Sequence, residues 1–167
     1  MTQTNAVSQV AQLIQQASQA QQQFESYNQT AVDELVTAVA WALVNPENNK
    51  MLSELAVAET GLGNVADKIT KNHRKTLGLL RDLKDAKTVG VIRRDPEQGI
   101  VEIARAVGVV GAIVPSTNPI ATPMNMILNA LKCRNAIILS PTSSPARCAA
   151  PPSITRSITM GTLGRQG

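Results

Sequence analysis

Aromatic side chains are almost absent from this chain of 167 residues, which holds only Phe24, Tyr27 and Trp41. Any core formed after Trp41 must therefore be aliphatic, and base stacking on aromatic rings is not expected. Long apolar runs are missing too, since none approaches the ~20 residues of a membrane-spanning helix. A composition of 43% hydrophobic and 17% charged residues is typical of a globular domain, or of a piece of one. We expect neither a nucleic acid nor a membrane as partner.

Cysteine and histidine are also scarce. Cys133 and Cys148 cannot form a disulfide framework, and the Gln-rich N-terminus lacks the features of a secretory signal, so we expect a cytoplasmic location. With His73 as the single histidine, no cysteine–histidine metal site is expected. Cys133 falls near the C-terminal end of a predicted helix, where the helix dipole disfavours a thiolate. A buried, inert Cys133 is therefore favoured over a nucleophile.

Acidic residues are confined to the N-terminal two thirds of the chain. Residues 1–102 hold twelve acids and ten Lys or Arg, a net charge of −2, whereas residues 103–167 hold six bases and no acid. A basic half can indicate a nucleic acid or an anionic ligand as partner. The six bases are scattered rather than clustered, which favours the simpler interpretation that their acidic partners lie elsewhere.

Apolar residues at three- and four-residue spacing predict amphipathic helices in the first half of the chain. These helices are expected over 5–26, 30–44, 46–61 and 65–84. Thr30, Asn45 and Asn64 are the predicted N-caps, and Gly61 is the predicted stop of the third helix. The apolar stripes, with Val7, Val10, Leu13 and Ile14 in the first helix and Leu77 in the fourth, are expected to face the core.

Two features around the fourth helix each allow a functional and a structural explanation. The other face of this helix carries Lys68, Lys71, Arg74 and Lys75, which form either a phosphate-binding patch or, as favoured, a solvated surface. Residues 61–66 match the dinucleotide pattern G-x-G-x-x-A, with Asp82 about twenty residues on. Because a helix precedes this pattern where a strand is needed, a helix stop followed by a helix start is the favoured explanation.

After Thr88 the hydrophobic period changes from helical to two. Residues 88–106 predict a β-hairpin with its turn at 94–99. The apolar strand 107–114, a helix with Pro123 in its first turn and a short strand over 135–139 predict a right-handed βαβ unit. The expected class is therefore α/β, with N-terminal helices, a hairpin and an incomplete sheet whose edges stay open.

A polar loop with Ser116, Thr117 and Asn118 follows the strand 107–114. Open α/β sheets bind ligands at this end of their strands. The Asn118 amide can donate to an oxyanion, or Asn118 can cap the next helix with Pro119 at its first position. The pattern alone favours the cap, and the two roles can coexist on different atoms.

Four segments carry a resemblance to a known family: 52–63, 71–73, 107–119 and 129–141. Within a match over about residues 5–141, they resemble the CoA-acylating branch of the aldehyde dehydrogenase superfamily, in particular its sulfoacetaldehyde and succinate-semialdehyde types. The resemblance implies a Rossmann-like cofactor domain that begins with the predicted βαβ unit. It also implies the conversion of an aldehyde, CoA and NAD(P)+ to acyl-CoA and NAD(P)H, with a cysteine nucleophile.

The resemblance further implies roles for single residues. Asn118 corresponds to the asparagine that helps to hold the oxyanion. The residues expected to contact NAD or NADP are Ile113, Val114, Pro115, Ser116, Ser140 and Pro141. The hairpin resembles the oligomerisation arm of the family, so we expect association of chains through the hairpin and the open sheet edge.

The chain is thereby divided into four segments. These are a helical segment (residues 1–87), an arm-like hairpin (residues 88–106), a first βαβ unit (residues 107–141) and an irregular tail (residues 142–167) that is expected to be disordered or out of frame. No cysteine stands in a nucleophile position and no Glu follows Asn118, so we expect an inactive fragment with weak or no cofactor binding. The alternative is a small non-catalytic protein that associates with an intact dehydrogenase subunit.

Overall fold

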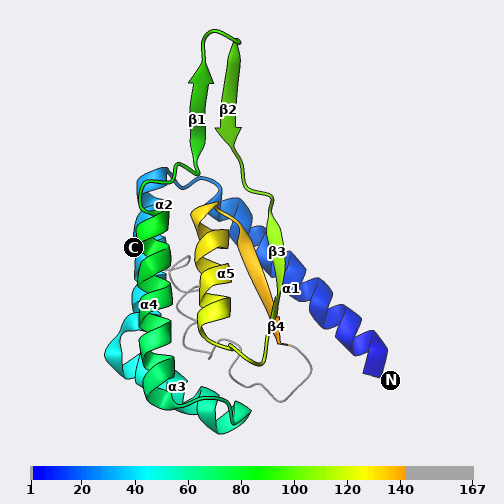
Figure 1. Cartoon of the computed structure of the whole chain (residues 1–167). Helices are drawn as coiled ribbons and strands as arrows, with labels where there is room; N and C mark the ends of the chain where they lie inside the picture. The colour runs from blue at the N-terminus through cyan, green and yellow to red at the C-terminus, as the bar shows by residue number, and fades with distance from the viewer. Residues whose placement is uncertain (1, 142–167) are drawn as a thin grey trace, which may run out of the picture.

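The computed structural model describes residues 2–141, and the predicted irregular tail 142–167 lies outside the described residues. The elements follow in the order α1 (Thr2–Phe24), α2 (Gln29–Val44), α3 (Pro46–Thr60), α4 (Val65–Leu83), β1 (Gly90–Asp95), β2 (Ile100–Ala104), β3 (Val109–Val114), α5 (Ala121–Lys132) and β4 (Ala136–Pro141) (Figure 1). The predicted α/β class is therefore confirmed. Within the described range, no helix combines the length and apolarity needed to cross a membrane.

Three predicted helix boundaries are confirmed by local contacts. The side-chain oxygen of Asn45 accepts a hydrogen bond from the Glu47 backbone N–H at 3.0 Å, and that of Asn64 accepts one from the Asp67 N–H at 2.9 Å. Gly61 ends α3 with a φ of 65°, a left-handed conformation that costs glycine little. The helix stop and helix start predicted for residues 61–66 are both present.

The predicted N-cap at Thr30 is wrong. Helix α2 begins at Gln29, and the side-chain oxygen of Asn28 accepts from the Ala31 N–H at 2.9 Å. Asparagine is a stronger N-cap than threonine, so the helix starts two residues earlier than Thr30 would start it.

One hydrophobic core is shared by the N-terminal helices and the βαβ unit. Its most buried side chains include Leu43 of α2, Leu52 of α3 and Leu128 of α5. Burial of each such side chain is worth about 1.5–3 kcal/mol. Apart from Phe24 and the adjoining Tyr27, the core is aliphatic, as the scarcity of aromatic residues predicts.

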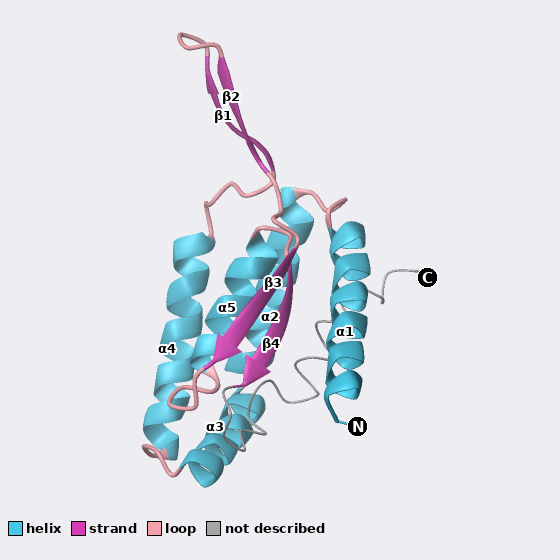
Figure 2. Ribbon diagram, turned by 90° about the vertical axis from the view of Figure 1, so that its right-hand side faces the viewer, coloured by secondary structure: helices cyan, strands magenta, loops and turns pink. Residues whose placement is uncertain are grey.

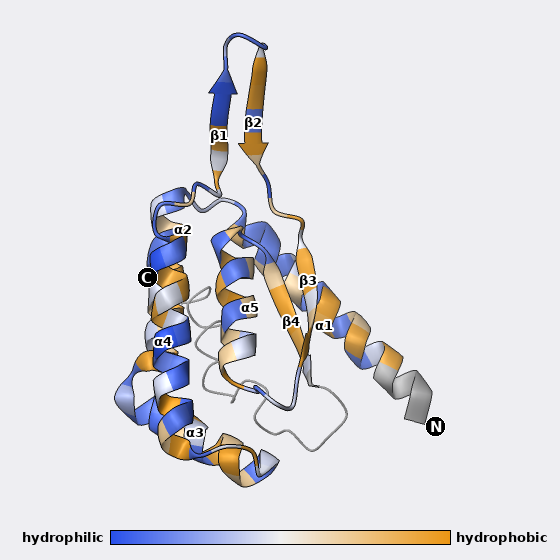
Figure 3. Ribbon diagram, in the orientation of Figure 1, coloured by the Kyte–Doolittle hydropathy of each residue, from blue (hydrophilic) through white to orange (hydrophobic). Residues whose placement is uncertain are grey.

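The apolar stripe of α1 does not face the core over its whole length. Val7, Val10, Leu13 and Ile14 are all exposed, with Val7 at 72%. Only the C-terminal end of the helix, at Gln21 and Phe24, is buried. The N-terminal end of α1 extends away from the other elements in Figure 1, and Figure 3 shows apolar (orange) stretches along this helix.

The fully buried side chains of α4 are polar, whereas Leu79 and Leu80 are half-buried against the core. The prediction for Leu77 is wrong, since this side chain is 41% exposed. The Asn72 amide is buried and donates to Asn49 Oδ1 at 2.9 Å and to Ser53 Oγ at 3.2 Å, both on α3. Because the Asn72 amide has two partners on α3, these hydrogen bonds offset the free-energy cost of burying it between the two helices.

The strands form two separate pairs. Strands β1 and β2 pair antiparallel as the predicted hairpin, which projects from the helical body. Strands β3 and β4 pair in parallel, as predicted for the βαβ unit. The turned view of Figure 2 places this parallel pair between α5 and α1, and both helices contact the strand pair.

A polar group that we call the Lys132 cluster (Gln29, Asp33, Thr88 and Lys132) joins α2, the hairpin base and α5. The Lys132 ammonium lies 2.6 Å from Asp33 Oδ1, which also accepts from Gln29 Nε2 at 2.9 Å. Gln29 Oε1 accepts from the Thr88 N–H at 2.8 Å, and the Thr88 hydroxyl donates to the Lys132 carbonyl. These contacts fix the C-terminal end of α5 against α2.

We expect the two partners of this ion pair to respond unequally to substitution. The Lys132 side chain is 3% exposed and that of Asp33 is 39% exposed. Asp33→Ala leaves a buried ammonium without its carboxylate, so the free energy of unfolding should fall by about 3 kcal/mol. Lys132→Met keeps the buried volume and leaves a carboxylate that reaches water, so the loss should be about 1 kcal/mol.

Urea unfolding followed by circular dichroism measures both losses. The control is Lys50→Met, which removes an exposed pair with Glu54 and should change the stability by less than about 0.5 kcal/mol. Equal losses for Asp33→Ala and Lys132→Met contradict the expectation.

Candidate functional site

The carboxyl ends of β3 and β4 form one edge, where the predicted cofactor residues meet. In the parallel register, Ile113 lies opposite Ser140 and Val114 lies opposite Pro141. Ile113 is 68% exposed and Ser140 is exposed, whereas Val114 is buried. Pro115 and Ser116 continue directly from β3 and are half-buried. The edge thus presents an apolar side chain beside a hydroxyl.

The Asn135 carboxamide sets the opposite end of the same strand pair. Its side-chain oxygen accepts from the backbone N–H groups of Val107 at 2.7 Å and Gly108 at 3.0 Å. The Ala136 N–H donates to the Gly108 carbonyl at 3.0 Å. Asn135 is buried, and these contacts align the start of β3 with the start of β4. They thereby determine which residues face each other at the carboxyl edge.

Asn118 is not the N-cap of α5, which corrects the interpretation favoured by its pattern. Helix α5 begins at Ala121, and Ile120 precedes it without a side-chain capping contact. The Asn118 amide nitrogen instead donates to the Thr122 hydroxyl at 2.9 Å. An amide nitrogen carries two N–H donors, so the contact with Thr122 orients the group and leaves a second N–H for an oxyanion.

Cys133 lies at the other end of α5 from Asn118. It is the C-cap residue of that helix and is half-buried, where the sequence predicts a buried side chain. A helix of 12 residues is about 18 Å long, so the Cys133 thiol and the Asn118 amide do not share a site. Among residues 2–141, no group of three or more His, Cys, Asp or Glu side chains is placed to hold a metal ion.

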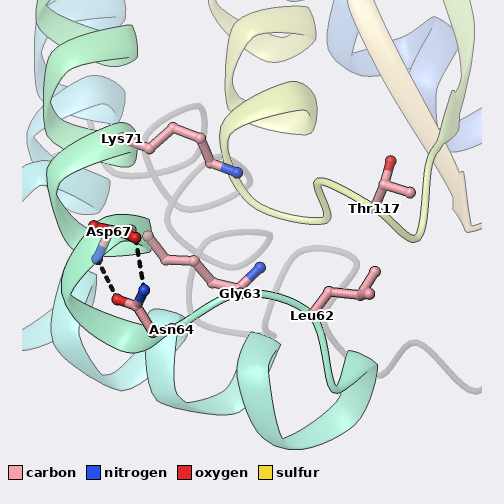
Figure 4. Close-up of a pocket in the computed structure, with 7 residues that line it drawn as sticks. Leu62, Gly63, Asn64, Asp67, Lys71 and Thr117 are labelled. Carbon is pink, nitrogen blue, oxygen red and sulfur yellow. Dashed lines mark hydrogen bonds between the residues drawn. The ribbon is translucent and has the colours of Figure 1, made fainter.

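A further cavity lies beside this loop, on the side of α4 where the sequence leaves a phosphate-binding patch as the less favoured alternative. This α4 pocket has a volume of about 190 Å³ and is lined by Leu62, Gly63, Asn64, Asp67, Lys68, Lys71 and Thr117. In Figure 4, Lys71 extends from α4 toward the loop that carries Thr117.

One side of the pocket comes from the glycine-rich segment 61–66, for which the sequence favours a helix stop and start over a dinucleotide site. Lys68 is 6% exposed, so the expectation of a solvated surface is wrong for this residue. It is confirmed for Arg74 and Lys75, which are exposed. The signal that could have indicated the pocket is the pair Lys68 and Lys71 one helical turn apart.

Comparison with known proteins identifies the class. The family model described as "Aldehyde dehydrogenase family" matches residues 2–151, and the chain therefore belongs to the aldehyde dehydrogenase family. The matched range extends past Pro141, where the sequence resemblance ended.

Two relatives and one solved structure show which members this chain is similar to. It is 61% identical over 132 residues to a sulfoacetaldehyde dehydrogenase (acylating) from Cupriavidus necator, covering 79% of this chain and 27% of the relative. It is 41% identical over 138 residues to a succinate-semialdehyde dehydrogenase (acetylating) from Clostridium kluyveri, covering 83% and 30%. An acetylating aldehyde dehydrogenase from Geobacillus thermoglucosidasius superposes with a TM-score of 0.86 at 39% identity, over 96% of this chain and 34% of that one.

The chain spans less than a third of the length of these curated relatives. The family and the similarity to acylating members were both predicted from the sequence, and both are confirmed.

We expect Thr122 to determine the orientation of the Asn118 amide. Thr122→Val removes the hydroxyl acceptor at constant size, so the Asn118 side-chain N–H signals should shift and exchange faster with water. Thr122→Ser retains the hydroxyl and should preserve both signals. NMR spectra of the 15N-labelled chain test this, and an Asn118 amide that is unaffected by Thr122→Val contradicts it. The stability loss should stay near ~1 kcal/mol, the usual net worth of one hydrogen bond.

Proposed function

We propose that this chain supplies the oxyanion donor and the first segment of the cofactor site of a CoA-acylating aldehyde dehydrogenase. The observation that carries the proposal is the single edge at which Ile113, Ser140 and the Asn118 loop come together. The acylating relatives named above support the branch. The reaction converts an aldehyde, CoA and NAD or NADP to an acyl-CoA and the reduced nucleotide.

Asn118 has the chemistry needed for the first step of such a reaction. Attack of a thiolate on an aldehyde carbonyl places a negative charge on the carbonyl oxygen. The Asn118 amide, held by Thr122, is a neutral donor that stabilises this charge without becoming ionised. One such donor contributes on the order of 10²–10³ in rate in enzymes that stabilise an oxyanion.

The carboxyl edge fits a nicotinamide nucleotide, whose chemistry when bound is to accept a hydride. Ile113 offers an exposed apolar side chain and Ser140 an exposed residue with a hydroxyl. These groups suit the apolar and hydroxylated portions of a nucleotide, and the end of parallel strands is the usual place for one. The proposed set of nucleotide contacts is completed by Val114, Pro115, Ser116 and Pro141.

The chain by itself should not turn over an aldehyde. Among residues 2–141, Cys133 is the cysteine that could act as nucleophile. It lies at the far end of α5 from the proposed oxyanion donor, a helix length of ~18 Å away. A thiol at that distance cannot attack a carbonyl whose oxygen is bound at Asn118.

An assay of the purified chain with sulfoacetaldehyde, CoA and NAD+ or NADP+ tests this expectation. We predict no reduced nucleotide above the background without protein, and weak or no binding of either nucleotide by fluorescence titration. An intact acylating dehydrogenase serves as the positive control. Production of NADH or NADPH that is abolished by Cys133→Ser overturns the assignment of Cys133 as inert. It also overturns the proposal that this chain supplies only the oxyanion donor and part of the cofactor site.

The hairpin supports a second candidate function, in which the chain associates with other subunits without catalysis. Val91 and Ile103 face each other in its register, and both are exposed on the projecting arm, as are Ile92, Ile100 and Val101. We propose that residues 88–106, which connect the helical segment 1–87 to the βαβ unit 107–141, act as an arm through which chains associate. Sedimentation velocity tests this role, and a chain that stays monomeric at all concentrations and beside an intact dehydrogenase contradicts it.

A further inference from the structure

We infer that the N-terminal end of α1 is an interaction surface that pairs with α1 of a second copy of this chain, as two antiparallel helices. This surface is distinct from the carboxyl edge of the sheet and from the hairpin. It lies where α1 extends away from the other elements (Figure 1). We call it the α1 seam, and it consists of four apolar side chains that are between 48% and 72% exposed: Val7, Val10, Leu13 and Ile14.

The apolar positions of α1 follow a heptad repeat. Separations that alternate between three and four residues connect Val7, Val10, Ile14, Ala17, Gln21 and Phe24. Leu13 adjoins this row. A repeat of ~3.5 residues forms a narrow row along the helix, which is the pattern of a helix that pairs with another helix. A helix that packs on a broad core has a wider apolar stripe.

The two ends of this repeat have different surroundings. At the C-terminal end, Gln21 and Phe24 are buried. Gln21 Nε2 donates to the Arg134 carbonyl at 3.4 Å, and the Phe24 ring meets Tyr27 edge to face with the centroids 5.1 Å apart. Ala17 is half-buried, and the α1 seam beyond it is exposed. One end of the repeat is thus buried within the chain, and a helix of another chain can lie along the other end.

Charge does not oppose pairing with an identical helix. Between Thr2 and Phe24, α1 contains no Asp, Glu, Lys or Arg. Charges beside such a row usually determine which partner a helix accepts, so a second copy meets the α1 seam without repulsion. A lipid surface fits less well, because helices that lie on membranes carry Lys or Arg on their polar face. The polar face of α1 is rich in glutamine instead.

The rest of the chain determines the orientation of the pair. The C-terminal end of α1 packs against β3 and β4 (Figure 2), on the side to which the buried Gln21 and Phe24 point. In a parallel pair, both βαβ units would lie at the same end and compete for space, whereas an antiparallel pair places them at opposite ends. With the two seams centred on each other, Val10 of one copy then lies opposite Ile14 of the second copy.

Sedimentation velocity of the whole chain, from micromolar to millimolar concentration, tests the inference. Because the α1 seam spans only about two helical turns, we expect a weak dimer with a dissociation constant in the high-micromolar range. Ile14→Lys places an ammonium in the seam and should weaken the dimer at least tenfold. Ile14→Gln should also weaken it and replaces Ile14→Lys if circular dichroism shows that the lysine variant does not fold.

The matched control is Gln12→Lys, which adds the same charge at an exposed position on the opposite face of α1. It should leave the dimer unchanged. A mixture of two variants tests the orientation. Val10→Lys and Ile14→Glu should each be monomeric alone and should dimerise when mixed, because the new ammonium and carboxylate face each other only in the antiparallel pair.

A hairpin variant separates the α1 seam from the proposed association arm. Ile103→Lys alters an exposed side chain of β2 and should leave the α1 dimer intact. A chain that is monomeric at every concentration, or a dimer that persists in Ile14→Lys, would overturn the inference. A dimer that is lost in Ile103→Lys and kept in Ile14→Lys would assign association to the hairpin instead. NMR signals of α1 that change only when an intact acylating dehydrogenase is added would assign the seam to that partner.

Discussion

The buried Asn135 carboxamide is the contact on which the proposed site depends. By accepting from the Val107 and Gly108 N–H groups, it aligns the starts of two parallel strands that local sequence does not align. A shift by one residue would turn every side chain of a strand to the other face of the sheet. The observed register instead places Ile113 opposite Ser140 at the carboxyl edge, and the Asn118 loop continues from there.

Helix α5 separates the polar and reactive side chains of the βαβ unit, which lie at its two ends. Asn118 precedes the helix and contacts Thr122 in its first turn, whereas Lys132 and Cys133 lie at its end. The ion pair between Lys132 and Asp33 holds that end against α2, so the beginning of the helix is positioned against the rest of the core. The α4 pocket lies on the Asn118 side because Thr117 belongs to its lining.

Sequence reasoning predicted the features that local signals determine. Asn45, Asn64 and Gly61 mark helix ends through contacts with their own neighbours, and the change to period two predicts the hairpin. It failed where tertiary contacts replace a local preference. The Asn118 amide contacts Thr122 rather than capping α5, and α4 buries Asn72 because Asn49 and Ser53 of α3 satisfy it. The cofactor residues came from family resemblance, and the burial of Lys68 from the structure alone.

Amide hydrogen exchange of the Asn135→Ala variant tests the central claim most directly. Loss of the carboxamide leaves the Val107 and Gly108 N–H groups without their protein acceptor. An unpaired N–H costs about 1–3 kcal/mol when buried, and less where water can reach it, as at Val107, which is 83% exposed. Protection of the amides in β3 and β4 should fall at least tenfold, while that of the buried amides in α2 should change less. Asn129→Ala, which removes a local contact with Asn125 on the exposed face of α5, is the control. Unchanged protection of β3 in Asn135→Ala would contradict the claim that Asn135 aligns the strands and thereby forms the site.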